Sequence, residues 1–80
     1  MVARAYILVS AVPGMEKQVM DEVSVIKGVS SADLVYGSFD LVVKIESEGP
    51  SDILLQTVRK IRNVMGVRAT LTMSTMGGRK

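Results

Sequence analysis

The chemically richest segment of this sequence is a short turn that contains glycine. It reads Tyr36-Gly37-Ser38-Phe39-Asp40. Such a turn can present backbone N–H groups and a carboxylate to a small polar ligand, with the aromatic ring as a wall. It can equally be an ordinary hairpin turn, in which glycine and aspartate serve the backbone geometry. The residues alone leave both interpretations open.

A second group of polar side chains alternates along the last apolar segment of the chain. Its hydroxyl groups belong to Thr70, Thr72, Ser74 and Thr75. On a strand, hydroxyl groups at this spacing pair across strands or bind a ligand at the sheet edge. The alternation places them on one face and an apolar row on the other, made of Val67, Ala69, Leu71 and Met73.

The composition offers little to catalysis or to metal binding. Histidine and cysteine are both absent, which removes most zinc sites and most general-base arrangements. Asp33 and Asp40 flank the turn and are interpreted as turn residues. Arg59, Lys60 and Arg62 are interpreted as a solvated helix end favoured by the helix dipole. We therefore expect no enzyme activity, no cofactor and no metal.

The overall charge balance is nearly even. Lys and Arg number 10, and Asp and Glu number 8, which disfavours a dedicated nucleic-acid-binding protein. The apolar runs are too short to cross a membrane, and no signal peptide is recognisable, so a cytoplasmic location is expected. We expect a single ligand-binding domain over residues 1–76 and a flexible basic tail over residues 77–80.

The elements that must position these residues follow from hydropathy patterning. Strand-like patterns occupy residues 3–12, 29–36, 40–48 and 67–76, and helical spacing occupies residues 15–26 and 49–65. Gly28 and Gly66 end the helices, and each is followed by valine. The order β-α-β-β-α-β predicts an α+β, ferredoxin-like sandwich of the dimeric α+β-barrel type. Its four-stranded antiparallel sheet carries both helices on one face.

This plan leaves one sheet face without a cover from the same chain. Residues 3–12 are apolar on both faces, as in a strand buried on both sides. The surplus apolar positions are Tyr6, Leu8, Val12 and Val42. An open face of roughly 400 Å² is near the upper limit for a monomer, so we expect a homodimer joined sheet to sheet. An RNA-binding sheet is disfavoured, because its aromatic stacking residues are missing.

Taken together, these segments resemble the effector-binding RAM domain of the Lrp/AsnC (feast/famine) transcription regulators. The similarity spans residues 3–76 and rests on G-S-F-D at 37–40, the Gly-Val steps at 28 and 66, and Thr70 with Thr72. It implies dimers that assemble into higher oligomers and bind a small amino acid between dimers. Gly37, Ser38, Phe39 and Asp40 would contact the ligand's amino and carboxylate groups. Thr70, Thr72 and Ser74 would line the opposite wall.

Full-length members of that family carry an N-terminal helix-turn-helix, whereas this sequence opens on its first strand. The resemblance therefore implies a stand-alone amino-acid sensor that does not bind DNA directly, and that either co-assembles with full-length regulators and modulates them or only senses amino acids. Three alternatives stay open. They are an ACT-type ligand-binding module, which Pro13-Gly14 fits only partly, a small α+β-barrel enzyme, and a purely structural oligomerisation module.

Overall fold

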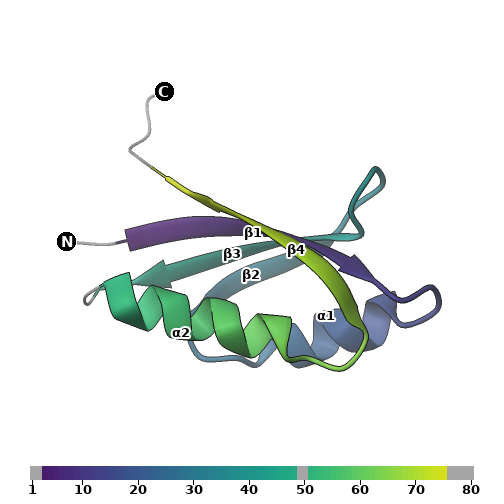
Figure 1. Ribbon diagram of the computed structural model, residues 1–80, viewed down its shortest axis with the longest axis horizontal. Coiled ribbons are helices and arrows are strands. Elements are labelled where there is room, and N and C mark those ends of the chain that lie inside the picture. Colours follow the sequence, from purple (N-terminus) through teal and green to yellow (C-terminus); the bar gives the residue numbers. More distant parts are fainter. Residues whose placement is uncertain (1–2, 49–50, 76–80) are drawn as a thin grey trace.

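The computed structural model describes residues 3–48 and 51–75, and the elements follow the predicted order (Figure 1). They are β1 (Ala3–Ala11), α1 (Glu16–Ser24), β2 (Val29–Leu34), β3 (Leu41–Ser47), α2 (Ser51–Arg62) and β4 (Val67–Ser74). The predicted ferredoxin-like sandwich is confirmed. The helix start at Gly49-Pro50, the strand end at Met76 and the tail at 77–80 lie outside the described residues.

The four strands form one antiparallel sheet in the order β2-β3-β1-β4. β1 lies in the interior of the sheet, so Ile7 faces Val43 on one side and Thr72 on the other. Both helices cover the same face (Figure 1). α1 packs mainly against β2, whereas α2 packs against β1, β3 and β4. Neither helix is long and apolar enough to span a membrane.

The hydrophobic core lies between the sheet and the helices. Its buried members are Ala5, Ile7, Val9, Ala11, Val19, Val23, Leu41, Val43, Ile45, Leu54, Val58 and Ile61. Each fully buried aliphatic side chain contributes about 1.5–3 kcal/mol relative to an exposed one. As predicted, the chain itself covers only one face of β1. Tyr6 is exposed and Leu8 is half-buried on the other face.

The turn between β2 and β3 is longer than predicted. The strands end at Leu34 and resume at Leu41, so the connection takes in residues 35–40 rather than Gly37-Ser38-Phe39 alone. The N–H of Val35 donates to the carbonyl of Asp40 over 2.9 Å, which closes the turn at its base. Tyr36 therefore lies in the turn and is fully exposed, instead of ending the strand.

Two glycines let each helix-to-strand connection approach the opposite helix. Gly28 has a φ of 101°, and a Cβ there would lie 2.7 Å from Thr57 Oγ1 on α2. Gly66 has a φ of 98°, and a Cβ there would lie 2.9 Å from Val19 Cγ2 on α1. Both the left-handed backbone and the lack of space require glycine at these positions.

We expect Gly28→Ala to destabilise the protein by about 3 kcal/mol. The positive φ contributes about 1–2 kcal/mol, and overpacking against Thr57 contributes about 1–3 kcal/mol. Gly14→Ala is the matched control, because Gly14 has a φ of 90° but nothing within 4 Å of its Cβ position. Urea unfolding of both variants measures the difference, and equal losses would show that the close approach to α2 carries no cost.

Candidate functional site

The turn at residues 35–40 rises from the sheet on the side away from the helices (Figure 1). Tyr36, Gly37 and Ser38 are exposed, and Phe39 is half-buried. Gly37 has a φ of 149°, and a Cβ there would meet nothing within 4 Å. The tip of the turn is therefore open to a partner or a ligand.

Asp40 anchors this turn to the middle of the sheet. Its Oδ2 accepts a hydrogen bond of 2.8 Å from the N–H of Ala11, and its own N–H donates to the carbonyl of Val9 over 2.9 Å. These bonds extend the β1–β3 pairing to the residue just before the start of β3. The Oδ2 atom of Asp40 thus stabilises the fold, whereas its Oδ1 atom makes no hydrogen bond to the described part of the chain.

The hydroxyl row lies along β4, an edge strand, on the face of the sheet that carries the helices. Thr70, Thr72 and Ser74 lie opposite Val9, Ile7 and Ala5 in the strand register. Thr70 is half-buried, whereas Thr72 and Ser74 are exposed. The row begins near the turn and runs away from it along β4. One chain therefore does not bring the two groups of predicted site residues together, and a pocket walled by both needs a second chain.

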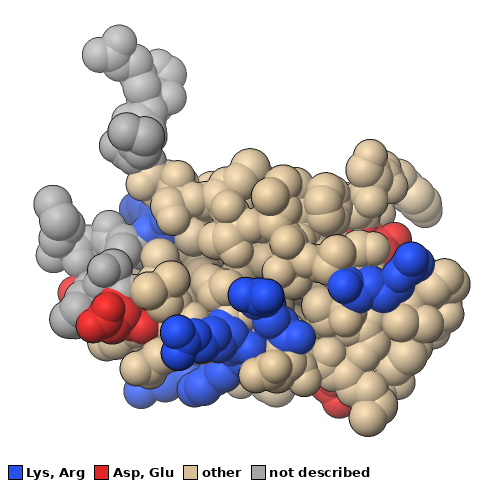
Figure 2. Space-filling view, in the orientation of Figure 1, with Lys and Arg blue, Asp and Glu red and all other residues tan. Residues whose placement is uncertain are grey.

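The open sheet face carries a cluster of large apolar side chains, which we call the apolar patch. It consists of Tyr6, Leu8, Val42, Leu71 and Met73. Leu8 lies opposite both Val42 and Leu71, so the side chains form continuous rows across the strands. The upper margin of the molecule, where this face is seen from the side, shows few charged groups (Figure 2).

Leu71 and Met73 were not predicted to belong to this patch. Alternation had grouped them with Val67, but Val67 pairs with the buried Ala11 and belongs to the helix side. A shift in the strand register between Ser10 and Ala11 separates Val67 from the others. Val12, predicted for the open face, lies beyond the end of β1, where its N–H donates to the carbonyl of Gly66.

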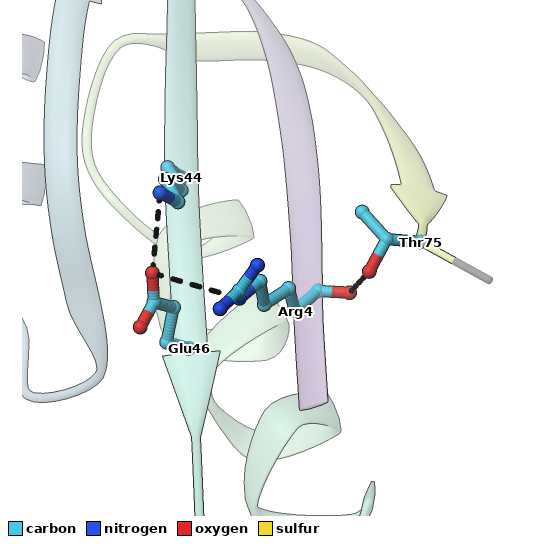
Figure 3. A network of polar contacts seen from close by, with 4 residues as sticks. All are labelled: Arg4, Lys44, Glu46 and Thr75. Atoms are coloured by element: carbon cyan, nitrogen blue, oxygen red, sulfur yellow. Dashed lines mark hydrogen bonds and ion pairs between the residues drawn. The ribbon is translucent and has the colours of Figure 1, made fainter. Parts of the chain in front are cut away.

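A polar cluster borders the apolar patch at one end (Figure 3). Glu46 Oε1 lies 3.2 Å from Lys44 Nζ and 4.0 Å from Arg4 Nε. Thr75 Oγ1 donates to the carbonyl of Arg4 over 3.2 Å and so ties the end of β4 to β1. An apolar centre with a charged rim is the usual anatomy of a protein interface.

No protein-family model matches the chain. Among solved structures, FFRP-DM1, a feast/famine protein, is 32% identical with a TM-score of 0.82, and the match covers 92% of this chain and 99% of that one. The chain belongs to the Lrp/AsnC (feast/famine) family. Hypothetical protein PHS023 from Pyrococcus horikoshii is 33% identical with a TM-score of 0.80, over 98% of this chain and 93% of its own.

Larger proteins share the fold of this Lrp/AsnC-family chain at lower identity. AsnC from E. coli is 12% identical with a TM-score of 0.81, over 95% of this chain and 52% of its own. The transcriptional regulator NMB0573 from Neisseria meningitidis, solved as a complex with L-Met, is 15% identical with a TM-score of 0.79, over 98% of this chain and 52% of its own. These likenesses show the fold alone, and this chain spans about half of each regulator.

One curated protein is also similar over part of the chain. Homocitrate synthase from Sulfurisphaera tokodaii is 43% identical over 49 residues, which is 61% of this chain and 10% of the enzyme. Because the match covers only a tenth of the enzyme, it is no evidence that this chain has the enzyme's activity. Within residues 3–48 and 51–75, no group of three or more acidic, histidine or cysteine residues is placed to hold a metal ion.

We expect Asp40→Ala to destabilise the fold by about 1.5–3 kcal/mol, because the Ala11 N–H loses a charge-assisted hydrogen bond. Asp40→Asn keeps an acceptor oxygen and should cost less. Asp33→Ala, an exposed aspartate on β2, is the control and should change stability by under about 0.5 kcal/mol. Chemical denaturation measures all three. If Asp40→Ala were as stable as the control, the carboxylate would have no anchoring role.

Proposed function

We propose that this chain is an amino-acid-sensing and oligomerisation domain of the Lrp/AsnC family, of the RAM type. The observation that carries the proposal is the apolar patch on the open sheet face. Contiguous exposed apolar surface with a polar rim favours association between copies. A sheet that packs on its own copy about a two-fold axis buries the same patch on both subunits.

The proposed ligand is a small amino acid held between copies. Exposed backbone N–H groups at Gly37 and Ser38 suit a carboxylate, and the half-buried ring of Phe39 suits an apolar side chain. The hydroxyl groups of Thr72 and Ser74 on another copy would supply the opposite wall. Two observations support this arrangement. The tip of the turn and the outer part of the hydroxyl row are exposed yet apart in one chain, and NMB0573, which has the same fold, was solved with L-Met.

We further propose that the chain is not itself an enzyme. The sequence contains no histidine or cysteine to serve as a base or nucleophile. An ACT-type ligand module would instead place its ligand at the connection between β1 and α1, and location of the bound amino acid separates the two.

The dimer interface is tested by Leu71→Asp, which places a carboxylate in the apolar patch. Leu55→Asp is a matched control, because Leu71 is 50% exposed on the sheet and Leu55 is 57% exposed on α2. We expect light scattering to show dissociation of the Leu71 variant and no change in the control, with unchanged circular dichroism. Identical masses for both variants and the unsubstituted protein would contradict a sheet-to-sheet dimer.

Amino-acid binding is tested by calorimetry against the twenty amino acids. We expect binding of at least one, and about tenfold weaker binding by Phe39→Ala, equivalent to about 1.4 kcal/mol. Tyr36→Ala, at the fully exposed neighbour in the same turn, is the control and should bind normally. The Phe39 variant should keep the dimer. No heat with any amino acid at millimolar concentration would overturn the sensing role.

A further inference from the structure

Positive charge is concentrated around the end of α2. Arg59 and Arg62 are three residues apart, and Asn63 follows Arg59 by four, so all three side chains lie on one flank of the helix turn. They line a shallow hollow at the surface. Lys and Arg side chains gather over α2 and the adjoining part of β4 on this side of the molecule (Figure 2).

The start of β4 adds a third arginine to this region. The connection from α2 to β4 is short and tightly turned, because the N–H of Val64 donates to the carbonyl of Ile61 and the N–H of Val67 donates to that of Val64, each over 3.2 Å. Arg68, the second residue of β4, therefore lies close to the end of the helix. We call Arg59, Arg62, Asn63 and Arg68 the basic surface.

Arg68 is the extra residue at the register shift in β4. Ala69 pairs with Ser10 and Val67 pairs with Ala11, which leaves Arg68 without a partner in the register. Such bulges change the direction of a side chain and occur often beside functional sites. Arg68 is also the one charged residue of β4, so the irregularity in this strand falls on its only cation.

The basic surface has no stabilising partner within its own chain. Its residues are exposed, and among the described residues the ion pairs join Glu46 to Arg4 and Lys44. The helix dipole favours Arg59 and Arg62 at the end of α2 but does not act on Arg68. A charge on an edge strand discourages pairing with other chains, but that purpose does not require Arg68 to lie beside two further arginines, which repel it.

We propose that the basic surface binds the phosphate backbone of a double-stranded nucleic acid. The guanidinium group of arginine presents a planar fork of donors that matches phosphate, and it is favoured over lysine for this purpose. The side-chain amide of Asn63 is suited to donate to a phosphate or sugar oxygen. The inference goes beyond the proposed sensing role, and it describes a contact with nucleic acid that needs no helix-turn-helix.

The shape of the surface favours a backbone over a small molecule or a single strand. The hollow has a volume of about 240 Å³ and is open and lined by polar residues, whereas small-molecule pockets have about 300–1,000 Å³ and mostly apolar walls. Single strands are bound by stacking on aromatic rings. The three aromatic residues lie elsewhere, Tyr6 on the open sheet face and Tyr36 and Phe39 in the turn at residues 35–40.

The even charge balance of the whole sequence hides a local excess. α2 and β4 carry four basic residues and one acidic, a net charge of +3, whereas α1 and β2 carry four acidic residues and one basic, a net charge of −3. The expectation that the chain does not bind nucleic acid rested on the total. The fold separates the two signs, so a polyanion is attracted to the basic surface and repelled by the side formed by α1 and β2.

The test measures the binding of a short labelled DNA duplex by fluorescence anisotropy. We expect micromolar affinity at about 0.05 M salt, and a plot of log affinity against log salt with a slope of about −3 per bound copy, because three arginines each neutralise one phosphate. Arg59→Gln/Arg62→Gln should bind at least about tenfold more weakly and should reduce the size of that slope by about 2. Arg68→Gln should reduce it by about 1.

Lys17→Gln/Lys27→Gln is the matched control, because it removes the same two charges from exposed positions on α1 and on the connection that follows it. This variant should bind as the unsubstituted protein does, and circular dichroism checks that all variants are folded. Two duplexes of unrelated sequence should bind equally, since contacts to phosphate carry no sequence information.

Three results would overturn the inference. They are no binding of the duplex at low salt, an unchanged affinity of the Arg59/Arg62 variant, and an equal loss in the Lys17/Lys27 variant. Tighter binding to phosphatidylglycerol vesicles or to polyglutamate than to the duplex would also overturn it, and would assign the surface to a membrane or to an acidic protein.

Calorimetry with amino acids on the same samples separates this inference from the proposed function. Amino-acid heats without duplex binding overturn the nucleic-acid contact and leave the sensing role in place. Duplex binding that depends on the three arginines, without any amino-acid heat, supports the contact and overturns the sensing role.

Discussion

The fold depends on a reciprocal contact between each helix and the connection that follows the other helix. Gly28, after α1, lies against Thr57 on α2, and Gly66, after α2, lies against Val19 on α1. Gly66 follows Gly28 by 38 residues, and Thr57 follows Val19 by the same number. The two contacts are therefore equivalent, one in each half of the chain. They set how closely each connection approaches the opposite helix.

This contact also connects the helical layer to the strands. The carbonyl of Gly28 accepts a hydrogen bond from the N–H of Glu46 on β3, and the carbonyl of Gly66 accepts one from the N–H of Val12. The hydroxyl of Thr57, a buried polar group, donates to the carbonyls of Ile53 and Lys27. Each half of the chain is thus positioned by the other half.

Periodicity was sufficient to predict the element order, the sheet type and the uncovered face. The apolar residues that alternate along β3 are the buried ones, and so are Val19 and Val23, which lie four residues apart on α1. The sequence did not predict the length of the turn at residues 35–40, because the hydrogen bonds of Asp40 join residues far apart in the chain.

The candidate site was likewise predicted from the sequence only in part. The turn and the hydroxyl row were identified by residue type, but their separation within one chain follows from the register of β4 on β1. Sequence alone cannot fix that register, because β4 contains a shift where it pairs with Ser10 and Ala11. Residue types thus identified the two groups, and the fold shows that they lie apart within one chain.

The register shift in β4 has a consequence for how this surface can change during evolution. With regular pairing, Val67 in the core would bring Leu71 and Met73 to the same side, and the threonines would line the open face. One extra residue in β4, rather than any substitution, places Leu71 and Met73 on the open face beside Tyr6, Leu8 and Val42. Loss or gain of that single residue is therefore a route by which relatives of this fold can exchange apolar side chains for hydroxyl side chains on the β4 part of the open face.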